Sequence, residues 1–144
     1  MDEVPGVASA DLSALCGTVA DVDDMTVTVL RDADSVSIIV TGEIDLLTVP
    51  RLSDTLSSEM AEKPSILVVD LDGVSFLSSV GITALALAER EARKKKINLR
   101  VVASGRITLR PLQITGMTEQ LAVYASRPEA LGRGGTTGHA QRGR

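Results

Sequence analysis

The stretch Val68–Ile82, with the sequence VVDLDGVSFLSSVGI, decides the fold of this chain. It begins as an apolar strand and passes through a short turn, after which Ser78 and Ser79 stand where a helix begins. The start of a helix has unpaired backbone N–H groups and the positive end of the helix dipole, so it stabilises a negative charge such as a phosphate. No histidine, cysteine or metal ligand stands nearby to activate either serine. The serine pair is therefore predicted to be a target of modification rather than a catalytic nucleophile.

A β-hairpin is predicted before this stretch. Residues 25–30 and 35–41 have the alternation of strands, and Arg31–Asp34 supplies turn residues between them. Thr48 is then predicted to cap a helix that ends at Lys63-Pro64. One face of that helix carries apolar residues at helical spacing, which are Val49, Leu52, Leu56 and Met60.

Strands and helices are predicted to alternate through the rest of the chain. Ile66–Val69 is an unbroken apolar run, typical of a strand that is covered on both faces. The later predicted elements are a helix from Ser79 to about Lys95, a strand over Asn98–Ala103, a helix over Leu109–Thr115 capped by Thr108 and followed by Gly116, a strand over Leu121–Tyr124 and a helical turn over Arg127–Leu131. This order predicts an α/β sandwich: an N-terminal hairpin, then a mixed and mostly parallel sheet with helices packed on it.

Charge is concentrated at the two ends of the chain. Residues 1–24 contain six acidic side chains and no Lys or Arg, whereas residues 132–144 contain three arginines and no acid. We therefore predict a flexible acidic arm over 1–24, a folded domain over 25–131 and a disordered Gly- and Arg-rich tail over 132–144. The folded part is nearly neutral and has only one Phe and one Tyr, which argues against nucleic-acid and membrane surfaces.

Cysteine use and hydropathy predict a soluble cytoplasmic protein. Cys16 is the only cysteine, so an internal disulfide is excluded and a cytosolic setting is favoured. No segment resembles a signal peptide, and no apolar run approaches the roughly 20 residues that span a bilayer.

Enzymatic functions lack their essential residues. The sequence has neither a G-x-x-x-x-G-K-[ST] phosphate loop nor G-x-G-x-x-G, and its one histidine, His139, lies in the predicted tail. Asp70 and Asp72 follow the predicted apolar strand and lie in the predicted turn, so we expect their carboxylates to be solvated there rather than to act in catalysis. Arg93–Lys96 ends a predicted helix, where cations offset the dipole. We expect no enzymatic activity, no cofactor and no metal.

Three motifs of this chain resemble the STAS family (sulfate transporter and anti-sigma factor antagonist), in its stand-alone anti-sigma factor antagonist form. The motifs are Gly42–Asp45 (GEID), Val68–Ile82, and Leu112–Met117 (LQITGM). Their order and spacing agree with the family over residues 25–131. The resemblance implies a STAS-like sandwich and a role in releasing a sigma factor.

The resemblance also implies a phosphorylation switch. Ser79 falls on the family's phosphoacceptor serine, and a serine kinase of the anti-sigma type would modify it with ATP. The unphosphorylated protein would bind that anti-sigma factor, and the phosphorylated protein would release it. The chain departs from the family's D-S-[ST]-G, because Ser78 replaces the acid. The partner-binding residues implied are Glu43, Asp45, Ser78, Ser79, Val80 and Gly81.

Other functions stay open at this point. N-capping alone would explain one of the two serines, and Ser78 competes with Ser79 as phosphoacceptor. An unswitched STAS subunit of a larger signalling or lipid-transport complex is the main alternative, and a weak nucleotide-binding protein is a third. We expect a monomer or weak dimer.

Overall fold

The computed structural model describes residues 25–132. The predicted acidic arm and, apart from Gly132, the predicted tail lie outside the described residues. Within the described part, strands and helices follow each other in the predicted order, beginning with the hairpin. The predicted α/β class with a mixed, mostly parallel sheet is confirmed.

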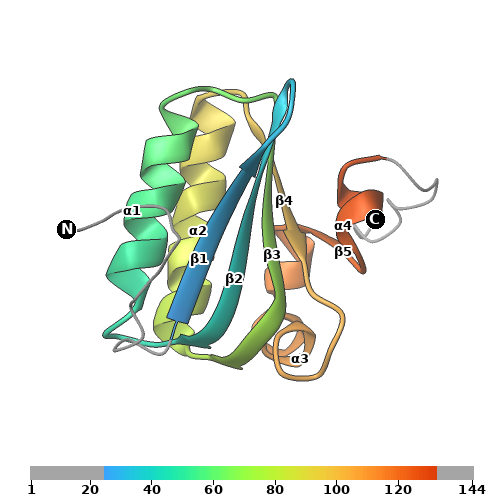
Figure 1. The fold of residues 1–144 in the computed structure, drawn as a ribbon. Coiled ribbons are helices and arrows are strands. Elements are labelled where there is room, and N and C mark those ends of the chain that lie inside the picture. Colours follow the sequence, from blue (N-terminus) through green and yellow to red (C-terminus); the bar gives the residue numbers. More distant parts are fainter. Residues whose placement is uncertain (1–24, 133–144) are drawn as a thin grey trace.

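Five strands form one sheet in the order of the sequence, β1-β2-β3-β4-β5 (Figure 1). β1 and β2 are an antiparallel hairpin, and the other neighbouring pairs are parallel. The strands are β1 (Met25–Arg31), β2 (Ser35–Ile44), β3 (Ile66–Leu77), β4 (Asn98–Val102) and β5 (Ala122–Tyr124). The carboxyl ends of β2, β3 and β4 therefore lie at the same edge of the sheet, which is where sites form in α/β folds.

Helices cover the two faces of the sheet unequally. They are α1 (Val49–Met60), α2 (Ser79–Lys94), α3 (Leu109–Ile114), the 3-10 helix η3 (Met117–Glu119) and α4 (Arg127–Ala130). α1 and α2 lie side by side on one face, and the short α4 packs beside β4 and β5 on the other (Figure 1). Half of the second face, over β1 and β2, is thus not covered by a helix of the described residues.

Alternation along the strands explains how both faces are packed. Ile38, Leu67 and Val69 point into the main core beneath α1 and α2. Val68, between two of these residues, points the other way and packs with Ala130 of α4. The sequence prediction of a strand buried on both faces is therefore confirmed for the first part of β3.

β3 is longer than the sequence predicted. The prediction ended the strand at Val69 and placed a turn next, whereas the strand continues to Leu77. β2 follows it through two shifts of register, the second of which lies between Gly42 and Glu43. Gly42 has a φ of 95°, which glycine adopts without a Cβ clash. Pairing with β2 therefore outweighs the turn propensity of the acidic and glycine residues in β3.

The two predicted threonine caps are in the predicted places, but their side chains do not cap the helices. Thr48 and Thr108 stand at the N-cap positions of α1 and α3, but neither side chain makes a capping hydrogen bond. Both have helical rather than extended backbone angles, so the hydroxyl is not aimed at the first helical N–H groups. Thr48 Oγ1 instead donates to the carbonyl oxygen of Glu43 at 2.8 Å and accepts from the Asp45 N–H at 2.9 Å.

The edge strand β1 is held at both ends by α1. Arg31 binds both carboxylate oxygens of Glu59, with Nη2–Oε2 at 2.6 Å and Nε–Oε1 at 3.2 Å. At the other end, Arg51 Nη1 donates to the carbonyl oxygen of Met25 at 2.8 Å. In this bidentate ion pair the Glu59 side chain is only 6% exposed, so the carboxylate is largely removed from water.

The end of α2 offers a test of backbone strain. Lys96 has a φ of 61°, and the next N–H, of Ile97, donates to the Ala92 carbonyl oxygen at 2.8 Å. This is the geometry of a helix end that favours glycine. We expect Lys96→Gly to raise the free energy of unfolding by about 0.5–1 kcal/mol, because left-handed backbone is costly for a residue with a Cβ. Urea denaturation measures it.

Lys94→Gly is the matched control for that substitution. Lys94 is the last residue of α2 and belongs to the helix, so glycine there should lower the free energy of unfolding instead, by up to about 1 kcal/mol. Equal effects of the two substitutions would contradict the assignment of strain to Lys96.

Candidate functional site

Ser78 and Ser79 have different roles at the start of α2. Ser78 is the N-cap, with extended backbone (φ −86°, ψ 172°), and its Oγ accepts from the Gly81 N–H at 3.4 Å. The Ser78 carbonyl oxygen also accepts from the Gly81 and Ile82 N–H groups. Ser79 is the first helical residue, is exposed, and makes no side-chain hydrogen bond within the described residues. Since Ser78 supplies the cap, the Ser79 hydroxyl is available to another molecule.

The GEID segment lies directly beside the serine pair. Ile44 pairs with Leu77 at the ends of β2 and β3, and the Ser78 N–H donates to the Ile44 carbonyl oxygen at 3.0 Å. One position earlier, Glu43 pairs with Phe76. Parallel strand pairing thus brings together two motifs that are far apart in the sequence.

Gly81 lets the first turn of α2 approach β2. It is buried, and a Cβ at this position would stand 2.6 Å from Ile44 Cγ2 and 2.9 Å from Leu77 Cδ1. Neither neighbour has room to accept it, because both side chains belong to the main core. Gly81 was predicted to bind the partner, and its burial gives it a positioning role in the described structure. Val80 beside it is half-buried.

The two acidic residues of GEID are placed differently. Asp45 Oδ1 accepts from the Leu47 N–H at 3.0 Å and the Thr48 N–H at 3.1 Å, so this carboxylate holds its own loop in shape. Glu43 is exposed, and its carboxylate makes no hydrogen bond or ion pair within the described residues. Of the two, Glu43 is the side chain that faces solvent without a structural task.

A set of exposed apolar side chains lies at or after the carboxyl ends of β2, β3 and β4, at the edge of the sheet where the serine pair stands, and the sequence analysis missed it. We call it the apolar rim. Its members lie in the β2–α1 loop, near the end of β3, and in and before α3; they are Leu46 (72% exposed), Leu47 (85%), Phe76 (50%), Ile107 (51%) and Ile114 (68%). Exposed apolar side chains gathered at one end of a fold mark interaction surfaces. Two consecutive leucines directly after GEID were the available sequence signal.

Sequence comparison identifies the family of the chain. The model of the STAS domain family matches residues 24–130. The chain belongs to the STAS domain family. It is 37% identical over 110 residues to the anti-sigma-F factor antagonist RsfB of Mycobacterium tuberculosis, which covers 76% of this chain and 88% of that protein.

Solved structures give the same picture. The crystal structure of an anti-sigma factor antagonist from Mycobacterium paratuberculosis matches with a TM-score of 0.73 and 33% identity, over 79% of this chain and 97% of that one. The structure of the anti-sigma factor antagonist SpoIIAA in its unphosphorylated form matches with a TM-score of 0.64 over 74% of this chain and 93% of that one. At 17% identity, the second match shows the fold alone.

The third motif of this STAS domain is structural. Leu112 and Met117 are buried in the main core, and Gly116 between them has a φ of 79°. The glycine ends α3 in the left-handed conformation, as the sequence predicted from its place just past the helix. LQITGM therefore positions α3, and its exposed Ile114 also belongs to the apolar rim.

Two features are absent from the described part of the STAS domain. Residues 25–132 contain no group of three or more side chains that could hold a metal ion. In the same part of the chain, every helix is too short or too polar to cross a membrane.

Proposed function

We propose that this STAS domain is an anti-sigma factor antagonist. While unphosphorylated it binds an anti-sigma factor that is also a serine kinase, so that a sigma factor is freed. Phosphorylation of Ser79 ends the complex. The observation that carries the proposal is the exposed, unbonded hydroxyl of Ser79 at the start of α2, beside a neighbour that already caps the helix.

The geometry suits a switch that leaves the fold intact. A phosphate on Ser79 would project from an exposed position of a helix start, where negative charge is stabilised. α2 has no acidic residue in its first turn that would repel it. The same phosphate would place about two negative charges in the middle of the partner surface, where they would have to be desolvated. The complex would therefore lose stability while the domain kept it.

The names of the relatives support the partner class. RsfB and the Listeria monocytogenes protein that is 28% identical over 93 residues are antagonists of anti-sigma factors. The apolar rim supports a protein partner in physical terms, because large exposed apolar side chains gain most by being covered. Glu43 would contribute a charged contact at its edge.

The experiment that tests this proposal is phosphorylation by the anti-sigma kinases of the same organism, with ATP and site mapping by mass spectrometry. A single phosphate on Ser79 from a kinase that also binds the chain is expected. A phosphate on Ser78 instead would contradict the assignment of the acceptor. Binding without modification would indicate an antagonist that phosphorylation does not switch, for which Ser78 in place of an acid is the supporting observation. If no kinase binds or modifies the chain, the proposal is overturned, and the alternative of an unswitched STAS subunit of a larger signalling or lipid-transport complex is favoured.

The apolar rim makes a separate prediction. Leu47→Asp should weaken binding of the anti-sigma factor by at least about 10-fold, because a partner that covers Leu47 would have to bury a carboxylate. The fold should not change, since the side chain is 85% exposed. Leu87→Asp is the matched control: this leucine is 55% exposed but lies in the middle of α2, away from the rim. Isothermal titration calorimetry would measure both, and equal losses would contradict the rim as a contact surface.

A further inference from the structure

A hollow lies on the face of the sheet that α1 and α2 do not cover. α4 packs over Val68 and Val102 and leaves a space between itself and the β1–β2 hairpin. The space measures about 150 Å³. Its lining residues are Leu30, Arg31, Asp32, Ser35, Ser37, Arg127 and Leu131. The hollow is remote from Ser79. Ser35 and Ser37 lie at the start of β2, whereas the Ser78 N–H donates to the carbonyl oxygen of Ile44 at the end of the same strand.

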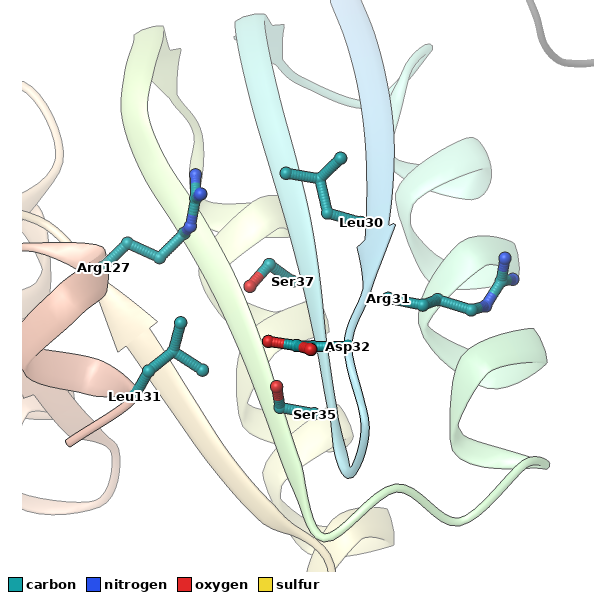
Figure 2. A pocket seen from close by; sticks show the side chains of 7 residues that line it. All are labelled: Leu30, Arg31, Asp32, Ser35, Ser37, Arg127 and Leu131. Atoms are coloured by element: carbon teal, nitrogen blue, oxygen red, sulfur yellow. The ribbon is translucent and has the colours of Figure 1, made fainter. Parts of the chain in front are cut away.

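The side chains converge from two sides, as Figure 2 shows. Leu30, Ser35 and Ser37 point from the hairpin towards α4, and Arg127 and Leu131 point from the α4 segment towards the hairpin. Arg31 points the opposite way, and its guanidinium is bound to Glu59 of α1. The hollow therefore has one inward-facing guanidinium, one carboxylate (Asp32), two hydroxyls and two leucines.

Ser37 has a buried hydroxyl that packing of the sheet does not explain. It is only 5% exposed, and it sits in register between Leu30 of β1 and Val68 of β3. Its hydroxyl nevertheless makes no hydrogen bond within the described residues, although buried polar groups are nearly always paired. Figure 2 shows this hydroxyl directed into the hollow. A valine would suit a buried strand position better, so the serine is unexplained by the fold.

Arg127 supplies the charge. It is half-buried at the start of α4, and its guanidinium forms no ion pair or hydrogen bond in the part of the chain that the structure describes. A guanidinium presents several N–H donors in one plane, which matches the two oxygens of a carboxylate. Together with the Ser35 and Ser37 hydroxyls, it forms a set of donors for one oxyanion.

We propose that this hollow binds a small monocarboxylate with a short aliphatic chain. Arg127 and the two serine hydroxyls bind the carboxylate oxygens, and Leu30 and Leu131 contact the chain. The volume admits a molecule of a few heavy atoms and no peptide. The lining carries one inward-facing guanidinium, of Arg127, and one carboxylate, of Asp32, so it accommodates a single negative charge better than a dianion such as phosphate.

The test is a ¹⁵N–¹H chemical-shift titration of the full chain with sodium butyrate, at ionic strength held constant with sodium chloride. We expect saturable shifts of the Leu30–Ser37 and Arg127–Leu131 amides, with a dissociation constant on the order of millimolar, as suits so small a ligand. The amides of Ser78 and Ser79 should not move. Sodium phosphate, titrated in the same way, should shift the same amides much less.

Three variants and a control sharpen the result. Arg127→Gln should weaken butyrate binding by at least about 10-fold. Ser37→Val should abolish the saturable shifts by filling the hollow, with the spectrum otherwise retained. Asp32→Asn should strengthen phosphate binding relative to butyrate. Arg110→Gln, an exposed arginine in α3, should change nothing.

Several outcomes would overturn the proposal. Shifts that never saturate, or that survive both Ser37→Val and Arg127→Gln, would show that butyrate binds elsewhere or acts only as a salt. If Ser37→Val fails to fold, Arg127→Gln carries the test alone, because Arg127 lies outside the core clusters. These results are independent of anti-sigma factor binding, so failure here leaves the proposed function untouched.

Discussion

Ser79→Glu is expected to reduce the affinity for the anti-sigma factor on the order of 100-fold, the largest effect of any substitution at the site. The carboxylate would stand where the proposed phosphate stands, between Glu43 and the apolar rim, and the partner would have to bury it without a counter-charge. Fluorescence anisotropy with the labelled partner measures the loss. The far-UV circular dichroism spectrum should be unchanged, because the substituted side chain is exposed.

Two controls isolate the charge at this position. Ser79→Ala removes the acceptor but adds no charge, so it should bind as tightly as the wild type and stay bound in the presence of ATP. Ser57→Glu adds the same charge to an exposed serine of α1 and should bind normally. Wild-type affinity for Ser79→Glu would contradict the switch, even if Ser79 proved to be phosphorylated.

The second large effect concerns the stability of the domain. Gly81→Ala should lower the free energy of unfolding by about 1–3 kcal/mol, as overpacking of a core does. The sign is informative, because alanine in a helix is ordinarily favoured over glycine by about 1 kcal/mol. Here the new Cβ would lie 2.6 Å from Ile44 Cγ2, which is attached directly to the branched Cβ and cannot swing aside. Urea denaturation measures the change.

A double-mutant cycle assigns that cost to the contact. Ile44→Ala removes Cγ2, so the cost of Gly81→Ala should be markedly smaller in that background than in the wild type. Gly105→Ala is the matched control, since a Cβ at Gly105 would meet nothing within 4 Å. Its effect should stay within about 0.5 kcal/mol. Additive effects of the Ile44 and Gly81 substitutions would contradict the steric explanation.

The order of the elements could be predicted because hydrophobic periodicity reports it directly. The alternation over 25–30 and the apolar run over 66–69 predicted strands of the right type, and α2 begins at Ser79 as expected. The second half of β3 could not be predicted. Its acidic and glycine residues are typical of turns, and only pairing with β2, through the register shift at Gly42, makes them a strand.

The site could be predicted as a set of residues but not as a division of roles. The sequence placed Ser78 and Ser79 at a helix start, and parallel strands imply that GEID lies nearby. That Asp45 holds its own loop while Glu43 stays exposed depends on distances of about 3 Å, which periodicity does not encode. The same is true of Gly81, whose need for a missing Cβ follows from the position of Ile44.

The neutral cap at Ser78 has a consequence for the lifetime of the two forms of the protein. α2 carries Arg93 and Lys94 in its last turn but no acid in its first, so only its carboxyl end has charges that complement the dipole. A phosphate on Ser79 would give the amino end of α2 a complementary charge as well. It would raise the free energy of unfolding by about 0.3–1 kcal/mol. The released form would then melt at a higher temperature than the binding form. The phosphorylated protein would then stay folded in the cell, and removal of the phosphate by a phosphatase would be enough to restore binding.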